Sequence, residues 1–491
     1  MEEFLESVRL VSRELERYWF ESISGSTCVV NQVPMRAIID ELNLKAHLET
    51  GGLTGDALAK FVGRYLSLSV RLHHPGSLAH QVAVPHPAAA LATLIEGFTN
   101  NPMGIYEMGP AAASIEAFVI EWLLSKVGWT SVPCNVADQP DVSGAGGVLT
   151  HGGSLANLAA LVAARSRFDN SVWARGCDGD LAVMATAGCH YSIARAAGIL
   201  GIGAENLYTL PDVSSDLEFN DQFETAMQRV RLAGKRPFAF VANACSTATG
   251  AFDPLEGIAR ICRAHGLWLH VDGAHGASAL LSRKHRHRLN GVESADSLTW
   301  DAHKLMRTPG LCTALLVRNA RTLDAAFHQD ASYLFHAKAQ PGFDSLHRTV
   351  ECTKASLGFR LFLVLAAMGE KALADYIDRQ FDLTQEAYKL FCSIPGLECP
   401  VAPQSNILCF RVVEGDDQMQ LSIRDRLLAE GEFHLSTAVV GDRRYLRLVV
   451  TSPSTERADL QRLARRVLQM VNRHTDAGSR HAPERDSFDE S

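Results

Sequence analysis

Four features of this sequence carry groups that could take part in chemistry. Lys304 supplies an amine directly after His303, at the end of a short strand-like run. Asp272 supplies a carboxylate at the end of an apolar run, and His190 supplies an imidazole after another such run. A Gly152-Gly153-Ser154 turn opens a helical segment. An amine, a carboxylate, an imidazole and an anion-binding helix start are together the groups that hold pyridoxal phosphate.

Each of these groups has a role in such a site. Lys304 would form the imine that carries the cofactor and then release it to the amine of a substrate. Asp272 is costly to bury without a cation, and a protonated pyridine nitrogen is a suitable partner, whose pKa the carboxylate raises. His190 would stack on the ring, and His303 would donate to the phosphate. Taken singly, a surface lysine and a hydrogen-bonded core histidine are the alternatives for Lys304 and His190.

The glycine turn suits a phosphate because it leaves backbone N–H groups exposed at the positive end of a helix. Ser154 is the expected N-cap of that helix. The turn is not a Walker loop, because no Gly-Lys-Ser/Thr follows it, and it lacks the G-x-G-x-x-G spacing of dinucleotide sites. An ordinary tight turn is the alternative for this motif by itself.

The region 143–318 alternates short apolar runs with helical segments, a rhythm typical of an α/β domain. The runs are apolar throughout, as strands covered on both faces should be. Ligands of such sheets bind at the carboxyl ends of the strands, where Asp272, His190 and Ser246 fall. The expected strands are Gly147–Thr150, Leu181–Ala187, Pro237–Ala244, Leu267–Asp272, Ser297–Thr299 and Leu311–Val317.

Helical spacing over residues 1 to about 70 predicts an arm that packs on its own domain or on a second subunit. We favour the second subunit, because no sheet precedes the arm. Three histidines within 72–81 match no zinc signature, so we expect no metal site. Further helices are expected over 87–98, 111–126, 356–368, 371–391 and 455–473, and strands over 407–412 and 445–451. The expected organisation is an N-terminal helical arm (1–75), a large cofactor-binding domain (76–350), a small C-terminal α+β domain (351–474) and a disordered tail (475–491).

Composition argues against several classes of partner. With 47% apolar and 21% charged residues, the 491-residue chain resembles an average globular protein of two or three domains. A net charge of −8 argues against nucleic acid as a partner, and no apolar run is long enough to span a membrane. The eleven cysteines form no CxxC pair, and the acidic N-terminus lacks the features of a signal peptide. We therefore expect a cytoplasmic protein.

The stretches Thr299–Met306 and His270–Gly276 resemble the group II pyridoxal-phosphate decarboxylases, which include glutamate, cysteine-sulfinate, aspartate and diaminobutyrate decarboxylases. The resemblance extends from about Gln81 to Pro453. It implies pyridoxal 5'-phosphate as the cofactor. It also implies the type I, aspartate-aminotransferase-like α/β fold with a mostly parallel central sheet, working as a homodimer with active sites at the subunit interface.

Position by position, the resemblance implies contacts to the cofactor. Lys304 matches the Schiff-base lysine and Asp272 the partner of the pyridinium nitrogen. Ala274 and His190 match residues on opposite faces of the ring. The family's phosphate contacts and the polar turn beside the cofactor match Gly153, Ser154, His303, Ser246 and Thr247.

Two positions match substrate contacts of the family. Gln81 falls where members that act on acidic substrates use a Gln near the side-chain carboxylate. Arg447 matches the arginine that binds the α-carboxylate, and bidentate pairing with a carboxylate is what a guanidinium does best. An exposed strand arginine is the alternative for Arg447 without the resemblance.

The sequence departs from the family pattern in a loop before the long C-terminal helix. Members carry a Tyr there as the favoured proton donor, but the corresponding segment, roughly 335–350, contains none, and Tyr333 lies just before it. His336 and His347 are its side chains best suited to proton transfer near neutral pH, and we favour His347. In this family, loss of the Tyr is associated with oxidative decarboxylation-deamination to an aldehyde. A smaller departure is Cys245-Ser246-Thr247, where relatives have Gly-Thr-Thr.

The sequence thus predicts pyridoxal-phosphate-dependent decarboxylation of a small amino acid, with aspartate, glutamate or cysteine sulfinate as the preferred substrates. Diaminobutyrate and aromatic amino acids are alternative substrates, and an aldehyde-forming or transaminating reaction on the same fold is an alternative outcome. A non-catalytic dimeric binding protein is the third reading. Intact Lys304, Asp272 and His190 argue against it.

Overall fold

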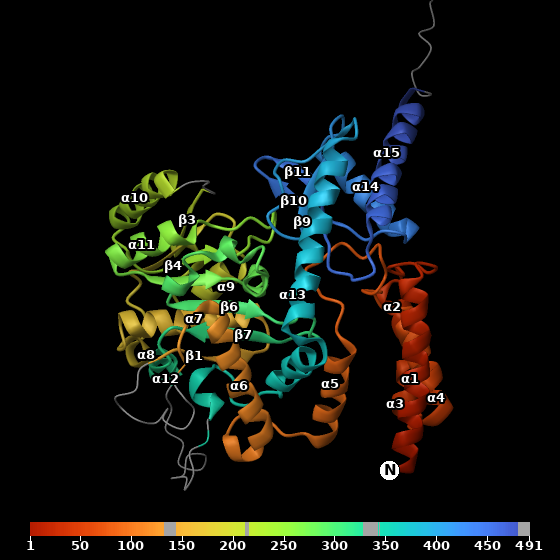
Figure 1. Ribbon diagram of the computed structural model, residues 1–491, viewed down its shortest axis with the longest axis horizontal. Helices are drawn as coiled ribbons and strands as arrows, with labels where there is room; N and C mark the ends of the chain where they lie inside the picture. Colours follow the sequence, from red (N-terminus) through yellow and green to blue (C-terminus); the bar gives the residue numbers. More distant parts are fainter. Residues whose placement is uncertain (132–143, 212–215, 328–341, 343, 480–491) are drawn as a thin grey trace, which may run out of the picture. The chain divides into compact units, whose positions relative to one another are not determined.

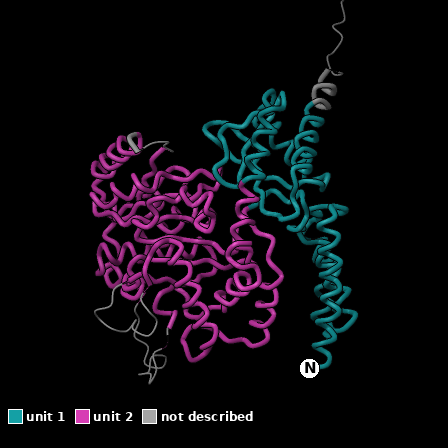
Figure 2. The backbone as a smooth tube through the Cα atoms, viewed as in Figure 1, with its two compact units in different colours: residues 1–80, 382–491 teal, residues 81–381 magenta. Residues whose placement is uncertain are grey.

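The computed structural model describes residues 1–131, 144–211, 216–327, 342 and 344–479. The chain forms two compact units, one of residues 81–381 and one that combines residues 1–80 with 382–491 (Figure 2). The helices and strands of each unit determine where the candidate site residues lie.

The unit of residues 81–381 is built on a sheet that has, in the described chain, seven strands in the order β1-β7-β6-β5-β4-β2-β3 (Figure 1). Strands β6, β5, β4, β2 and β3 pair in parallel, and β7 pairs antiparallel with its neighbours β6 and β1. This confirms the predicted mostly parallel α/β sheet. The strands are β1 (Gly146–Thr150), β2 (Leu181–Thr186), β3 (Leu207–Leu210), β4 (Arg236–Asn243), β5 (Trp268–Asp272), β6 (Ser297–Asp301) and β7 (Thr313–Val317).

Side chains alternate across these strands and build a core on each face of the sheet. In β4, Phe240 and Ala242 join one core, while Ala239 and Val241 join the other. The first core also contains residues of α6 (Pro110–Val127), α10 (Asp216–Leu232), α11 (Leu255–His265) and the first part of α13 (Leu357–Cys392). The second core contains residues of α7 (Gly153–Phe168), α9 (Ser192–Ile199) and α12 (Arg321–Phe327). Burial on both faces explains why the strands read as continuous apolar runs in the sequence.

The helices of this unit follow the α/β rhythm predicted for it (Figure 1). Their bounds are α5 (Pro87–Thr99), α6 (Pro110–Val127), α7 (Gly153–Phe168), α8 (Val172–Arg175), α9 (Ser192–Ile199), α10 (Asp216–Leu232), α11 (Leu255–His265) and α12 (Arg321–Phe327), with 3-10 helices at η1 (Tyr106–Met108), η2 (Ala204–Asn206), η3 (Gly276–Leu281), η4 (Arg286–Leu289), η5 (Val292–Ser294) and η6 (Ser345–Arg348).

The six strands predicted for this region are confirmed to within two residues at each end. The sequence missed β3, whose residues are half-buried or exposed except for Leu210. Because β3 lies at the edge of the sheet, it lacks the continuous apolar run by which the buried strands are found.

The second unit contains an antiparallel sheet in the order β10-β11-β9-β8, packed with α14, α15 and the last part of α13. The sequence predicted two of these strands, β9 and β11, but not the short β8 or the partly exposed β10. Its elements are α1 (Glu2–Ile23), α2 (Met35–Glu41), α3 (Leu44–Thr50), α4 (Gly55–Ser67), β8 (Leu397–Glu398), β9 (Ile407–Val412), α14 (Asp417–Glu430), β10 (Ser436–Val440), β11 (Arg443–Val449) and α15 (Arg457–Ser479).

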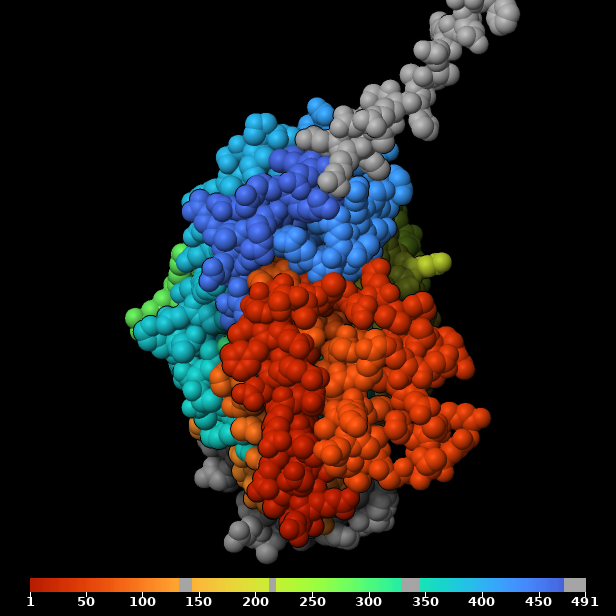
Figure 3. Space-filling model, turned by 90° about the vertical axis from the view of Figure 1, so that its right-hand side faces the viewer, coloured from red at the N-terminus to blue at the C-terminus, as the bar shows by residue number. Residues whose placement is uncertain are grey.

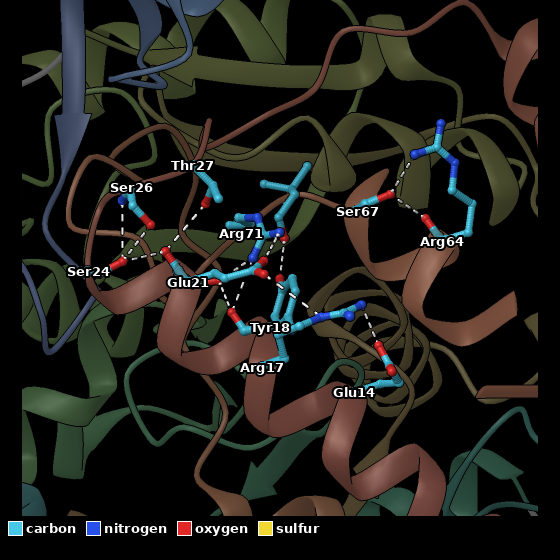
Figure 4. Close-up of polar contacts among 12 residues, drawn as sticks. Glu14, Arg17, Tyr18, Glu21, Ser24, Ser26, Thr27, Arg64, Ser67 and Arg71 are labelled. Carbon is cyan, nitrogen blue, oxygen red and sulfur yellow. Dashed lines mark hydrogen bonds and ion pairs between the residues drawn. The ribbon is translucent and has the colours of Figure 1, made fainter. Parts of the chain in front are cut away.

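Buried Arg71 ties the chain after α4 back to α1 (Figure 4). Its Nη1 donates to the carbonyl oxygen of Tyr18 at 3.1 Å and to the hydroxyl of Ser22 at 3.0 Å, and its Nη2 pairs with Oε2 of Glu21 at 2.9 Å. The N-terminal helices are therefore ordered by a specific polar anchor. Figure 3 shows the N-terminal helices in red on the face turned to the viewer. Large apolar side chains of α1 are exposed, including Leu15 at 49% and Trp19 at 43%.

Helix α13 (Leu357–Cys392) runs through both units and contains a kink at Gly369, where φ is +76°. The two helices predicted over 356–368 and 371–391 are thus continuous apart from this kink. Leu361 and Phe381 belong to the core of the first unit, while Ala387 and Phe391 belong to that of the second. This packing places the division of the chain after residue 381, whereas the sequence places a boundary after residue 350. Helix α15 extends to Ser479, and the rest of the predicted tail lies outside the described residues.

Candidate active site

A cavity of about 300 Å³ lies in the unit of residues 81–381. Asn243, Asp272 and Asp301 on its wall are the last residues of β4, β5 and β6. The carboxyl ends of parallel strands therefore meet here, as predicted. The predicted site residues that line the cavity are Gln81, Gly153, Ser154, His190, Thr247, Asp272, Ala274, His303 and Lys304.

Asp272 is buried at the end of β5 and both its carboxylate oxygens accept hydrogen bonds. Oδ1 accepts a hydrogen bond from the backbone N–H of Ala274 at 3.1 Å, and Oδ2 accepts one from Nδ2 of Asn157 at 2.9 Å. Two donors hold the carboxylate in one orientation on the cavity wall. This is the arrangement needed to face a cationic ring nitrogen.

The amide of Asn157 on α7 connects Asp272 to His190. Its Nδ2 also donates to the hydroxyl of Ser192 at 3.0 Å, and that hydroxyl lies 2.8 Å from Nδ1 of His190. The backbone N–H of Ser192 donates to the same ring nitrogen at 3.3 Å, so Nδ1 is the acceptor of the imidazole. Burial lowers the pKa of His190, with the charge of Asp272 opposing it. A neutral, fixed ring is suited to stacking.

His270, on the same strand as Asp272, supports Asn157 from behind. Its Nε2 lies 3.0 Å from Oδ1 of Asn157, and its Nδ1 lies 2.8 Å from the hydroxyl of Ser297. Complete burial lowers the pKa of His270 to about 4. The ring is therefore neutral near pH 7 and donates one hydrogen bond while accepting another.

Lys304 lies beside a second buried carboxylate. Its Nζ is 3.1 Å from Oδ2 of Asp301, and Oδ1 of Asp301 accepts the hydroxyl of Thr313 at 2.6 Å. His303 hydrogen-bonds through Nδ1 to the carbonyl of Cys312 at 3.0 Å, and its Nε2 is 3.6 Å from Asp301. Asp301 thus holds the amine of Lys304 against the cavity wall.

The glycine turn before α7 forms a tight cradle. Gly152 has φ +110°, a conformation that favours glycine. A Cβ on Gly153 would lie 3.0 Å from Oδ1 of Asp301 and 3.4 Å from Cβ of Ala274. The N-cap is Gly152, with no side-chain cap, so the expectation of Ser154 as N-cap is wrong. Because the helix begins at Gly153, Ser154 lies in its first turn.

Three predicted residues do not line this cavity. Ser246 is buried, with its hydroxyl 2.9 Å from that of Thr249. His347 lies in η6, and Arg447 lies in β11 of the other unit, where its Nη1 donates to the carbonyl of Ala79 and the hydroxyl of Ser436, both at 3.1 Å. His336 falls outside the described residues. The roles given to these residues stay predictions.

The sequence reasoning left other cavity residues without a role. Asn157 follows Gly153 by one turn of α7, which places both on one helix face, and Asp301 and Asn243 end strands. Those two signals were available in the sequence. The cavity residues without an assigned role are His151, Gly152, Asn157, Asn243, Cys245, His275, Asp301 and Leu311.

Two general features of the described residues bear on partners. Among them, we find no group of three or more His, Cys, Asp or Glu side chains arranged to hold a metal ion. None of the helices described is both long and apolar enough to cross a membrane.

Comparisons with known proteins agree with this geometry. Residues 64–413 match the pyridoxal-dependent decarboxylase conserved domain. The cysteine sulfinic acid decarboxylase of Rattus norvegicus is 30% identical over 437 residues, which cover 85% of this chain and 86% of the relative. The acidic amino acid decarboxylase GADL1 of Mus musculus is 28% identical, with 85% of this chain and 77% of the relative covered.

The fold is also that of solved decarboxylases. The crystal structure of mouse CSAD superimposes with a TM-score of 0.83 at 26% identity, covering 94% of this chain and 98% of that one. The family match spans most of the chain and includes the cavity residues. The chain therefore belongs to the pyridoxal-dependent decarboxylases, as an amino-acid decarboxylase whose cofactor is pyridoxal 5'-phosphate.

Proposed function

We propose that the substrate is a small acidic amino acid, namely aspartate, glutamate or cysteine sulfinate, which loses its α-carboxylate as carbon dioxide. The observation that carries this proposal is Gln81, which lines the cavity together with Lys304. An amide N–H is a suitable donor to a second carboxylate of the substrate. Support also comes from the names of relatives that act on acidic amino acids at 28–30% identity.

The cavity residues fit pyridoxal phosphate on two observations. The fixed carboxylate of Asp272 suits a pyridinium nitrogen. The close packing at Gly153 leaves backbone N–H groups, not a side chain, facing an anion. We assign the phosphate to Gly153, Ser154 and His303, and the ring faces to Ala274 and His190. When bound, the cofactor supplies an electron sink for the bond that breaks.

Residues of the protein itself are assigned to hold the cofactor, to orient the substrate and to transfer a proton. Lys304 would hold the cofactor through its amine, and Asp301, 3.1 Å from Nζ, would hold that amine when it is free. Ser246 and Thr247 form the polar turn after β4. Arg447 is assigned to the α-carboxylate of the substrate, and His347 is the proton donor that the sequence favours.

We further propose that the protein works in the cytoplasm as a homodimer with active sites at the subunit interface. The exposed apolar side chains of α1, among them Leu15 and Trp19, support a subunit contact. A second subunit would also supply further residues to the substrate side of the cavity.

Two alternatives have specific support, one for the substrate and one for the product of the reaction. A diaminobutyrate decarboxylase of Acinetobacter baumannii is 28% identical over 445 residues, and Asp301 provides a second carboxylate for a cationic side chain. The absence of Tyr from 335–350 favours an aldehyde-forming reaction. An aromatic substrate is the remaining alternative.

The test is a product assay on purified protein with added pyridoxal phosphate. Aspartate, glutamate, cysteine sulfinate, diaminobutyrate and aromatic amino acids are each supplied, with Lys304→Ala as the blank. We expect equal amounts of carbon dioxide and amine from one acidic substrate, and none from the blank. Turnover of diaminobutyrate alone would overturn the substrate proposal, and ammonia with aldehyde would replace the proposed reaction.

A further inference from the structure

Two ionisable side chains without an assigned role are joined at the cavity wall. His151 lines the cavity directly before the glycine turn, and its Nδ1 is hydrogen-bonded to Oε1 of Glu351. Glu351 is itself held, because Thr349 donates its hydroxyl to Oε2 at 3.3 Å and accepts the backbone N–H of Glu351 at 3.3 Å. We refer to His151 and Glu351 as the dyad.

Buried Glu116 on α6 holds both chain segments of the dyad. Its Oε1 accepts the backbone N–H of Leu149, just before His151, at 3.1 Å. The same oxygen pairs with Nζ of Lys354, just after Glu351. The side chains of Glu116 and Lys354 are 2% and 0% exposed, and breaking such a buried pair is strongly unfavourable. The fold therefore presets the approach of His151 to Glu351.

The other imidazoles on the cavity wall are differently placed. His190 accepts hydrogen bonds at Nδ1 from Ser192, and His275 is buried. The side chain of His303 is 12% exposed and lies 3.6 Å from Asp301, beyond hydrogen-bonding distance. Among the cavity imidazoles in the described chain, His151 combines a hydrogen-bonded carboxylate with a side chain that is 34% exposed.

Decarboxylation places a specific demand on a proton donor. The bond from the α-carbon to the carboxylate breaks, its electron pair stays behind, and the α-carbon takes up one proton per turnover. The donor must then regain a proton from water, so it must reach both the cavity and the solvent. We propose that His151, which lines the cavity, is this donor in place of His347, which does not line it. Nε2 is the transferring atom, because Nδ1 is engaged by Glu351. Glu351 is a positioning residue that orients the ring and balances its charge.

This inference rests on the proposed decarboxylation and adds its proton donor. If the donor is missing, the proton is delivered to the cofactor's carbon instead. That turnover ends in carbon dioxide, an aldehyde and pyridoxamine phosphate, with the substrate nitrogen left on the cofactor. The ratio of amine to pyridoxamine phosphate therefore reports on proton delivery to the α-carbon, separately from loss of carbon dioxide.

The experiment compares His151→Gln, Glu351→Gln and His347→Gln with wild type on the amino acid that wild type turns over. His287→Gln is the matched control, since His287 is exposed on η4 and does not line the cavity. We expect kcat to fall about 100-fold in His151→Gln and about tenfold in Glu351→Gln, in the range of general acid catalysis. Pyridoxamine phosphate should accumulate in both, with cofactor affinity within about threefold of wild type.

Other outcomes have distinct meanings. Near-native kcat and product ratio in His151→Gln, or a loss confined to His347→Gln, would overturn the proposal. If His151→Gln binds the cofactor poorly, Glu351→Gln decides, because it retains the imidazole. An unchanged product ratio in that variant overturns the proposal.

A second readout does not depend on the substrate. The ring resonance of His151 is identified by its absence from the spectrum of His151→Gln, using histidine labelled with ¹³C at the ring. We expect it to shift when pyridoxal phosphate alone is added. A resonance that does not respond to the cofactor rules out His151 as the donor. If it responds but no amino acid of the panel is turned over, only the substrate proposal has failed.

Discussion

At the scale of single residues, Asn157 connects the groups assigned to the cofactor ring. Its amide donates to Asp272 and Ser192, and its oxygen accepts from His270 and Thr299. All four hydrogen-bonding positions of one buried amide are thus used by the site. A small polar residue on α7 determines the orientation of two groups that belong to different strands and loops.

Replacing Asn157 by Ala should weaken cofactor binding while leaving Lys304 in place. Asp272 would lose one of its two donors, which costs about 1–3 kcal/mol for a buried charged group. We expect the dissociation constant for pyridoxal phosphate, measured by fluorescence titration, to rise about tenfold or more. Ser192→Ala is the control, because it breaks only the branch to His190. Equal dissociation constants for Asn157→Ala and wild type would contradict the role of Asn157.

His270 should make the fold sensitive to acid. Because its pKa in the folded protein is about 4 and that of a free histidine is about 6.5, the unfolded chain binds this proton first. The contribution of neutral His270 to the free energy of unfolding is therefore fully present above about pH 6.5. It is lost as the pH drops towards 4, which lowers the free energy of unfolding by about 3 kcal/mol in total. Thermal unfolding of wild type and His270→Gln between pH 4.5 and 7.5 tests this. Parallel pH dependences in the two proteins would show that His270 does not contribute.

At the scale of elements, the start of α7 is pressed against the end of β6. Gly153 lies against Asp301, and that carboxylate is held by Thr313 and Lys304. The carboxylate therefore has little room to move away from an added methyl group. The helix start, the strand end and Lys304 thus form one packed cluster.

Alanine favours helix formation more than glycine does, but the substitution Gly153→Ala should disturb this cluster. We expect cofactor affinity to fall about tenfold, because the added Cβ would lie 3.0 Å from Oδ1 of Asp301. Gly97→Ala on α5 is the matched control, since no atom lies within 4 Å of its added Cβ. That variant should gain up to about 1 kcal/mol of stability and keep native affinity. Native cofactor affinity in Gly153→Ala would exclude a tight cradle.

At the scale of the whole molecule, helix α1 is one of the elements on which a single chain leaves large apolar side chains exposed. Leu15 and Trp19 are one helical turn apart and both are exposed. Contiguous apolar surface of this kind marks contact with another protein surface. A second copy of the chain is the partner that we propose.

Introducing charge on this face should therefore separate the subunits. We expect wild type to have twice the mass of one chain in light scattering, and Leu15→Glu with Trp19→Glu to dissociate at micromolar concentration. Arg13→Glu, on the same helix, is the control for added negative charge and should stay dimeric. A double variant that keeps the wild-type mass would place the subunit contact elsewhere.

The sequence by itself determined the fold class, the cofactor and the lysine–carboxylate–imidazole set, because these depend on local patterns. Buried strands such as β4 appear as apolar runs, and Asp272 and Lys304 follow directly from the ends of such runs. The edge strand β3 lacks that pattern and was missed for this reason. The compact units divide within α13, after residue 381, whereas the boundary expected from the sequence follows residue 350, since a helix gives no local sign of which core it joins.

Only the tertiary structure decided which distant side chains meet. His151 and Glu351 are 200 positions apart, and Asn157 and Asp272 are 115 apart. Such pairs depend on strand order, on register and on buried ties such as Glu116 to Lys354. Local periodicity reports the environment of each residue but not the identity of its partner. The groups that could bind the cofactor were therefore readable from the sequence, whereas the hydrogen bonds that orient them required the fold.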